Sequence, residues 1–179
     1  MDTSSIESAL TRLGATLPED LHAQILLVGG AAAMLTGLLP ASRTTIDCDV
    51  MHCTPEGRLR EIERAAESIA ADLGLPERWL NSDARLRLDA LPDGWSERKV
   101  YIGSYGPLMI HAISRPDFIA MKTLAGRAQD LEDLNHLEPR PDEIAFARDY
   151  LNTLAFKGTS QDQIDDALAL LDSLEPDSP

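Results

Sequence analysis

Two aspartates one residue apart, Asp47 and Asp49, are the side chains of this sequence best suited to chemistry. The alternation of residues 44–50 predicts a β-strand, so both carboxylates should project from the same face. Carboxylates held side by side repel each other, and a divalent cation bound between them removes that repulsion. The pair therefore indicates a metal site. The alternative is a strand end whose acids form salt bridges, for example with Arg43.

A glycine pair, Gly29 and Gly30, lies upstream of the aspartates. It follows the short apolar run 25–28, which predicts a buried strand, and precedes the stretch 31–39, which predicts a short helix. Glycines let a backbone approach an anion closely, and the N–H groups that open a helix face such an anion. Metal-holding acids beside a phosphate-holding turn are the parts of a phosphoryl or nucleotidyl transfer site. Taken alone, the glycines could equally serve strand-to-helix packing.

Together these residues resemble the polymerase-β-type minimal nucleotidyltransferase fold, and in particular the branch of AbiEii-like toxins and related bacterial proteins. The first block of the resemblance is Gly29-Gly30, the short helix, Arg43, Thr45, Asp47 and Asp49. The second block, similar to the downstream helix of that branch, is Lys122, Ala125, Arg127, Asp130, Asp133 and Leu134. With Trp79-Leu80-Asn81 between the blocks, the resemblance covers roughly residues 20–137.

The resemblance implies Mg²⁺ on Asp47 and Asp49 and a nucleoside triphosphate (NTP) whose phosphates lie at Gly29 and Gly30. Many members of the family have Ser where this chain has Gly30, and that hydroxyl contacts a phosphate. Here only the backbone N–H remains, so the phosphate contacts would be shared with the loop that follows the short helix. The residues expected to share them are Ser42, Arg43 and Thr44.

The fold also implies a third carboxylate, which often comes from a later strand and activates the acceptor hydroxyl. Asp89 is the candidate, because residues 85–89 alternate like a strand. Asp83 lies nearby, and either acid could instead be an ordinary loop residue. Without such a base, in-line attack on the nucleotide would lack its proton acceptor.

Lys122 is expected from the resemblance to reach the nucleotide phosphates, as a compact charge on a flexible stem can. The alternative is an exposed surface lysine. On one continuous helix, Lys122 and Asp133 lie within about 20° of each other around the axis but about three turns apart, so they should not form an ion pair. Arg127 is expected to anchor Asp130 or a neighbouring strand end rather than to touch substrate. Asp130 and Asp133 would orient the two basic residues or border the acceptor side of the nucleotide pocket.

The chain carries 30 acidic against 16 basic residues, a net charge of −14. The resulting negative electrostatic potential repels phosphate backbones, which argues against extended DNA binding. A small basic patch could still bind one tRNA end. No apolar run approaches the roughly 20 residues of a membrane span, and the first residues lack the features of a signal peptide. We therefore expect a cytoplasmic protein without a membrane partner, and a reduced pair of cysteines, Cys48 and Cys53.

The expected fold class is α/β (α+β), a small mixed sheet with helices mainly on one face. Residues 1–115 would form this nucleotidyltransferase-like core, and residues 116–179 a helical region packed on it. In the strand that carries Asp47 and Asp49, the side chains of Cys48 and His52 should both point to the opposite face. A hairpin is expected at 99–113. A first helix is expected at 4–13, ended by Gly14, and a second from a Thr54 cap to residue 73. Further helices are expected from Ser114 onward, at 141–156 and at 160–174.

We expect a Mg²⁺-dependent nucleotidyltransferase that moves a nucleoside monophosphate from an NTP to an acceptor and releases pyrophosphate. By analogy with the family, the acceptor is a tRNA or a protein, and the enzyme could be the toxin of a toxin–antitoxin pair, with an antitoxin protein as its partner. The alternative is a catalytically degenerate member of the fold that binds nucleotide or a partner protein, which Gly30 and the ambiguous third acid favour. An aminoglycoside-type modifier would suit the acidic surface, but no dedicated acidic pocket can be located.

Overall fold

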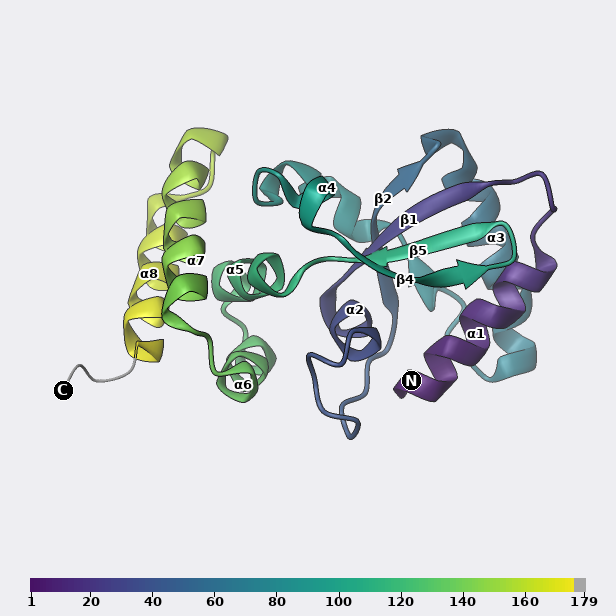
Figure 1. Ribbon diagram of the computed structural model, residues 1–179, viewed down its shortest axis with the longest axis horizontal. Coiled ribbons are helices and arrows are strands. Elements are labelled where there is room, and N and C mark those ends of the chain that lie inside the picture. Colours follow the sequence, from purple (N-terminus) through teal and green to yellow (C-terminus); the bar gives the residue numbers. More distant parts are fainter. Residues whose placement is uncertain (176–179) are drawn as a thin grey trace. The chain divides into compact units, whose positions relative to one another are not determined.

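The computed structural model describes residues 1–175, except for the side chains of Leu86, Arg87 and Asp89 (Figure 1). The described chain forms two compact units, each of which is considered by itself. The sheet unit comprises residues 1–88 and 98–113, and the helical unit comprises residues 89–97 and the chain from Ser114 onward. A mixed sheet with flanking helices and a helical C-terminal region confirms the expected α/β fold class.

Five strands form one mixed sheet in the order β3-β2-β1-β5-β4 (Figure 1). They are β1 (Ala23–Val28), β2 (Cys48–Thr54), β3 (Leu80–Asn81), β4 (Val100–Tyr105) and β5 (Leu108–Ala112). The central strand, β1, pairs antiparallel with β2 and parallel with β5, and β4 and β5 form the expected hairpin. Most of β1 is buried, as its apolar sequence predicts. The sheet core therefore centres on the strand that leads into the glycine pair.

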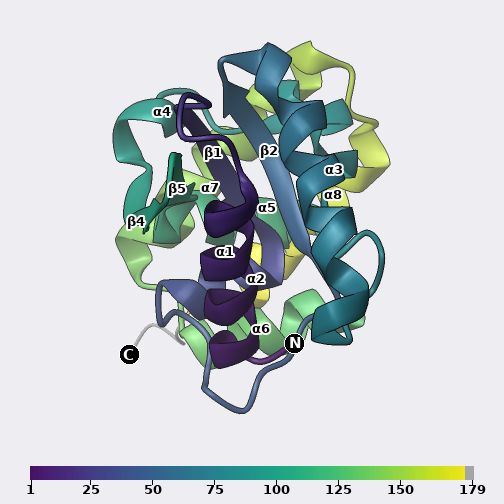
Figure 2. The ribbon, with the colours of Figure 1, turned by 90° about the vertical axis from the view of Figure 1, so that its right-hand side faces the viewer.

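Helices α1 (Thr3–Thr16) and α3 (Leu59–Ala70) lie side by side over one face of the sheet (Figure 2). Each buries an apolar stripe, and removing that surface from water is what holds an amphipathic helix on a sheet. The prediction that Gly14 ends the first helix is wrong, because α1 continues beyond it. An added Cβ at Gly14 would lie 2.2 Å from the carbonyl oxygen of Tyr105. The glycine lets two backbones touch instead of ending the helix.

The connection between β2 and α3 differs from the prediction that Thr54 caps the helix. Thr54 is the last residue of β2, and a 3₁₀ turn, η1 (Glu56–Arg58), precedes α3. The residue before α3 makes no side-chain cap hydrogen bond. The helix is held by its buried face, as the predicted apolar stripe requires. The buried residues of α3 are Leu59, Ile62, Ala66, Ile69 and Ala70.

The segment that follows β3 is a 3₁₀ helix, η3 (Asp83–Ala90), so the strand predicted at 85–89 is wrong. Local hydrogen bonds start this helix: the backbone amide of Asp83 donates to the side-chain oxygen of Asn81 at 3.0 Å. An Asn side chain that bonds the amide two residues ahead favours a turn over a continued strand. The alternation of leucine with charged residues here does not mark a strand of the sheet.

The remaining helices are α4 (Trp95–Arg98), α5 (Arg115–Ala125), α6 (Ala128–Leu137), α7 (Pro141–Leu154) and α8 (Gln161–Leu174). The helices expected from Ser114, at 141–156 and at 160–174 are thus present. Helices α5, α7 and α8 share one apolar core, which includes Ala120, Leu151 and Leu171. In the described part of the chain, no helix combines the length and the apolar character that crossing a bilayer requires.

Candidate functional site

Asp49 lies beside the glycine turn that follows β1. It pairs across the sheet with Val28, the last residue of β1, and α2 (Gly29–Leu35) begins at the next residue. Gly29 has a φ of +70°, a conformation that side-chain-bearing residues rarely adopt. An added Cβ there would also lie 3.1 Å from Oδ2 of Asp49. Both the backbone conformation and the nearby carboxylate therefore require glycine at this position.

Asp47 lies just before β2, so the strand predicted at 44–50 begins later than expected, at Cys48. Its Oδ2 accepts a hydrogen bond of 3.4 Å from Nδ2 of Asn81. Asn81 in turn pairs with Asp49 in the register of β2 and β3. Both aspartates are half-buried. The two acids and the Asn81 amide therefore gather at one end of β2.

Trp79 fixes β3 and with it Asn81. Its side chain is fully buried, and its indole Nε1 donates to the carbonyl oxygen of Ala66 at 2.9 Å, the kind of partner that a buried indole requires. The carbonyl oxygen of Trp79 accepts the amide of Cys48 at 2.6 Å. The resemblance covered Asn81 but assigned it no role, because a single amide carries no distinguishing pattern in a sequence.

The loop between α2 and β2 carries the residues predicted to share the phosphate contacts, Ser42, Arg43 and Thr44. The first and last of these are exposed, and the guanidinium Nη1 of Arg43 donates to the carbonyl oxygen of Thr44. The next residue, Thr45, lies beside the second glycine, because an added Cβ at Gly30 would be 3.4 Å from its Oγ1. That hydroxyl also donates to the carbonyl oxygen of Asp47 at 3.2 Å. Thr45 thus connects the glycine turn to the first aspartate.

Cys48 is fully buried, which is consistent with the prediction that its side chain points away from the aspartates. Burial, and after it the charges of Asp47 and Asp49, raises the pKa of its thiol far above the ordinary value. Burial also raises the pKa of Cys53 to about 11. Both thiols therefore stay protonated near neutral pH and belong to the core rather than to the site.

His52 lies on the same face of the sheet as Asp49, and the prediction that it faces away is wrong. The register of β1 and β2 shifts by one residue between Leu26 and Leu27. Leu26 pairs with His52, and Val28 pairs with Asp49. Because alternate residues of β1 lie on one face, their partners on β2 share that face as well. The β-bulge reverses the phase that simple alternation predicts.

Lys122 is buried in the helical unit and is held by two acids. Only 7% of the residue is exposed, and its Nζ lies 2.5 Å from Oδ1 of Asp130 and 2.7 Å from Oδ2 of Asp133. The prediction that Lys122 and Asp133 form no ion pair is therefore wrong, and Lys122 is not an exposed surface lysine. The cause is Gly126, whose φ of +57° and whose hydrogen bond to the carbonyl of Lys122 end α5 before α6 begins.

Asp130 is also bound by Arg127, as predicted. The guanidinium Nε of Arg127 lies 2.7 Å from Oδ2 of Asp130. Burial by itself raises the pKa of Asp130, but the hydrogen bonds and charges of Arg127 and Lys122 outweigh it, so this pKa lies below its ordinary value. Asp130 therefore remains a carboxylate at neutral pH and fixes the position of the Lys122 ammonium.

The side chain of Asp89, the predicted third carboxylate, lies outside the described residues, so its role stays a prediction. The alternative, Asp83, pairs with Arg78 at 2.6 Å on the surface. Where side chains are described, no three His, Cys, Asp or Glu residues form a group that could hold a metal ion. Asp47 and Asp49 are therefore considered as a two-carboxylate site.

The chain matches a known family over most of its length. Residues 6–164 match the family described as nucleotidyltransferase of unknown function (DUF6036). The matched stretch contains the glycine turn, Asp47, Asp49 and Lys122. The mixed sheet with its flanking helices is consistent with a nucleotidyltransferase fold. The chain therefore belongs to this family of nucleotidyltransferases. No curated protein and no solved structure shows a significant match.

Proposed function

We propose that the protein is a Mg²⁺-dependent nucleotidyltransferase that moves a nucleoside monophosphate from an NTP to an acceptor. The observation that carries this proposal is the position of the Asp49 carboxylate beside the Gly29 turn, with Asp47 close by, just before the strand that carries Asp49. Family membership supports the class of reaction. The geometry supports assigning the metal and phosphate contacts to these residues.

Asp47 and Asp49 would hold the Mg²⁺ ion. Magnesium takes oxygen ligands and usually binds through one or two carboxylates, while water and substrate phosphates complete its coordination. Two carboxylates next to a turn that Gly29 keeps free of a side chain fit this requirement. When bound, Mg²⁺ supplies neutralisation of the charge that develops on the phosphates.

The phosphates of the NTP would contact the backbone at Gly29 and Gly30. The Thr45 hydroxyl lies next to the point where a serine side chain at position 30 would begin. We therefore infer that Thr45 offers the hydroxyl that many members of the family supply from that serine. Further contacts would come from the adjoining loop, through Ser42, Arg43 and Thr44.

In the proposed transfer, an acceptor hydroxyl oxygen forms a bond to the α-phosphorus of the NTP. The bond between that phosphorus and the oxygen bridging to the β-phosphorus breaks, and pyrophosphate leaves. Asp89 is the proposed base that accepts the hydroxyl proton. Lys122 is the proposed cation for the phosphates, and its ion pairs with Asp130 and Asp133 would hold its ammonium in one orientation.

The acceptor would be a tRNA or a protein, as the family resemblance implies. A member of the AbiEii-like branch would act as the toxin of a toxin–antitoxin pair and would have an antitoxin protein as its partner. This part of the proposal rests on the resemblance alone, because enzymes that share one fold can act on many different acceptors. The site residues themselves favour only the nucleotide half of the reaction.

A labelling experiment tests the reaction. Wild-type protein and the Asp49→Asn variant are incubated with Mg²⁺, total cellular RNA and protein, and each common NTP labelled at the α-phosphorus. With the wild type, label should pass to an acceptor. With the variant, the rate of label transfer should be at least about a hundredfold lower, because half of the metal-binding charge is lost. Label at the γ-phosphorus should appear only in pyrophosphate, which distinguishes this transfer from that of a kinase.

The matched control is Asp72→Asn, the same substitution at an exposed acid of η2 (Ala71–Leu73), which should retain full activity. Transfer by Asp49→Asn at the wild-type rate would contradict the proposed site. Gly30 favours a second candidate function, nucleotide binding without chemistry. Mg²⁺-dependent NTP binding by the wild type without any transfer would support that alternative over the enzyme.

A further inference from the structure

Asn81 is a buried amide whose two polar atoms are both in use. Only 5% of the residue is exposed. Its Oδ1 accepts the backbone amide of Asp83 at 3.0 Å, and its Nδ2 donates to Oδ2 of Asp47 at 3.4 Å. Because a backbone N–H can only donate, the atom that faces Asp83 must be the amide oxygen, and the NH₂ group must face Asp47. The side chain therefore has one favourable orientation, in which it offers a donor to the carboxylate.

The main chain that carries this amide is fixed by the sheet and by α3. In the parallel register of β2 and β3, Asn81 lies opposite Asp49. Two residues before Asn81, the carbonyl oxygen of Trp79 accepts the amide of Cys48, and the buried indole donates to Ala66 of α3. The strand β3 is only two residues long, yet hydrogen bonds from two neighbouring elements keep it in place. A donor on such a support keeps its position without help from a ligand.

Asp47 needs support of this kind because it lies outside the strand. The strand β2 begins at Cys48, so the pleat of the sheet does not set the direction of the Asp47 side chain as it does for Asp49. The Thr45 hydroxyl bonds the carbonyl oxygen of Asp47 and so fixes its main chain. The Asn81 amide acts on the carboxylate itself. The main chain and the side chain of this aspartate are therefore held by two different residues.

An amide suits this position better than a charged side chain would. Asp47 and Asp49 together supply the two negative charges that one Mg²⁺ ion neutralises. A lysine or arginine at position 81 would compete with the ion for Asp47, and a third acid would repel both aspartates. An amide forms its hydrogen bond without changing the charge of the pair. Because that bond uses Oδ2 of Asp47, Oδ1 can serve the metal.

We propose that Asn81 is a positioning residue of the metal site, which holds the Asp47 carboxylate in the orientation that Mg²⁺ requires. The carboxylate is then ordered on folding rather than on binding, so the ion binds more tightly. Hydrogen-bond partners of metal ligands commonly contribute about ten- to a hundredfold to metal affinity. This inference deepens the proposed function and rests on it, because it presupposes Mg²⁺ on Asp47 and Asp49.

The test is Mg²⁺ binding without turnover. Mg²⁺ affinity is measured by calorimetric titration in the presence of a non-hydrolysable NTP analogue. Asn81→Ala should bind Mg²⁺ about ten- to a hundredfold more weakly than the wild type, because Asp47 loses its orienting donor. In the labelling assay, the Mg²⁺ concentration for half-maximal transfer should rise by the same factor. The rate at saturating Mg²⁺ should stay close to that of the wild type, because the bound ion then holds Asp47 itself.

Asn81→Ser separates the two contacts of the amide. A serine hydroxyl can still accept the Asp83 amide, as it does in turns, but it is too short to reach Asp47. This variant should lose as much Mg²⁺ affinity as Asn81→Ala. Its free energy of unfolding, measured by urea denaturation, should lie closer to that of the wild type, because the Asp83 amide keeps a partner.

Two controls separate positioning from a general loss of stability. Asn152→Ala makes the same substitution at an exposed position of α7 and should leave Mg²⁺ affinity unchanged. Ser114→Ala removes the side-chain cap of α5, where the hydroxyl accepts the amide of Asp117. This variant should lower the free energy of unfolding and leave Mg²⁺ affinity unchanged.

The possible outcomes distinguish this inference from the proposed function. Wild-type Mg²⁺ affinity in Asn81→Ala, or in Asn81→Ser alone, would overturn the inference. If Asp49→Asn binds Mg²⁺ at least about tenfold more weakly than the wild type in the same assay, the proposed metal site stands. Equal Mg²⁺ affinity of Asp49→Asn and the wild type would overturn the metal site and the inference with it. A reduced rate of Asn81→Ala that saturating Mg²⁺ does not restore would assign Asn81 a different role and likewise overturn the inference.

Discussion

Lys122 and Asp133 form an ion pair of 2.7 Å although they lie on different helices, α5 and α6. The pair exists because Gly126 ends α5 in a left-handed conformation, after which α6 brings both Asp130 and Asp133 to the ammonium. The ring of Phe118 lies 5.3 Å from the same ammonium. Three charged groups are thus buried together. Such a cluster is stable only while each charge keeps its partner.

Lys122→Met should therefore destabilise the protein by about 3 kcal/mol or more, because two acids lose their shared cation in a buried site. The free energy of unfolding is measured by urea denaturation. If Lys122 instead contributes only to phosphate binding, the variant will unfold like the wild type and lose activity alone.

A triple variant serves as the control for this prediction. Lys122→Met combined with Asp130→Asn and Asp133→Asn removes all three charges, and it should recover most of the lost stability. Lys157→Met removes a lysine whose ion pair is solvent-exposed, and it should change the free energy of unfolding by less than about 1 kcal/mol. A triple variant as unstable as Lys122→Met would show that packing, and not charge, causes the loss.

Gly29→Ala should both destabilise the fold and weaken the metal site. The positive φ costs about 1–2 kcal/mol for alanine, and the new Cβ would press on the Asp49 carboxylate. The expected loss of Mg²⁺ affinity is roughly tenfold, as for other changes that displace a metal ligand. Calorimetric titration with Mg²⁺ and a non-hydrolysable NTP analogue measures this loss.

Gly37→Ala is the matched control. Gly37 has a φ of +71° but would place its Cβ where no atom lies within 4 Å. It should therefore show the same backbone cost without a change in Mg²⁺ affinity. Equal metal affinity in the two variants would separate Gly29 from the metal site and contradict the assignment of Asp49.

Stability should fall steeply in acid. Burial alone would raise the pKa of Asp130 and Glu143, but their hydrogen bonds to basic side chains hold both below the ordinary values of 3.8 and 4.5. A carboxyl group whose folded-state pKa is lowered stabilises the fold above its unfolded-state pKa, and that contribution is lost as the pH falls through the folded-state value. The midpoint of thermal unfolding should therefore decrease most steeply below about pH 4.5.

Asp130→Asn should make the decrease of the unfolding midpoint in acid less steep, because the substituted side chain no longer takes up a proton. Asp166→Asn, at an exposed position of α8, should keep the wild-type profile. The measurement is thermal unfolding followed by circular dichroism across the acid range. A wild-type midpoint that rises as the pH falls through this range would reverse the sign and contradict the prediction.

The neighbourhood of Gly29 and Asp49 was accessible to sequence reasoning because it lies within a short stretch of chain. A strand, a turn, a helix and a second strand follow one another there, so a single β-pairing places the acid beside the glycine. The β4–β5 hairpin was predictable for the same reason, since its two strands adjoin one turn. Local patterns are informative where the contact itself is local.

The positions of His52 and Lys122 depend on structural features that sequence patterns do not reveal. A β-bulge adds one residue to a strand without changing its composition, so nothing in the sequence marks the phase reversal at His52. Gly126 was visible, but a glycine can either end a helix or lie within one. Gly14 lies within α1 because another backbone touches it, and only the tertiary structure distinguishes the two cases.

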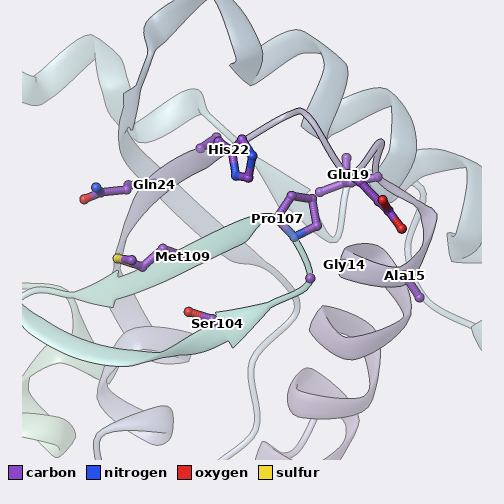
Figure 3. A pocket seen from close by; sticks show the side chains of 11 residues that line it. Gly14, Ala15, Glu19, His22, Gln24, Ser104, Pro107 and Met109 are labelled. Atoms are coloured by element: carbon purple, nitrogen blue, oxygen red, sulfur yellow. The ribbon is translucent and has the colours of Figure 1, made fainter.

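The contact between Gly14 and the hairpin turn forms, from main chain, one wall of a pocket of about 630 Å³ (Figure 3). An added Cβ at Gly106 would lie 2.4 Å from the carbonyl oxygen of Gly14, and both glycines border the pocket. A side chain at either position would displace the hairpin as a whole. A relative whose pocket has a different shape should therefore diverge at Ser104 or Met109, whose side chains can change size and polarity without shifting the scaffold.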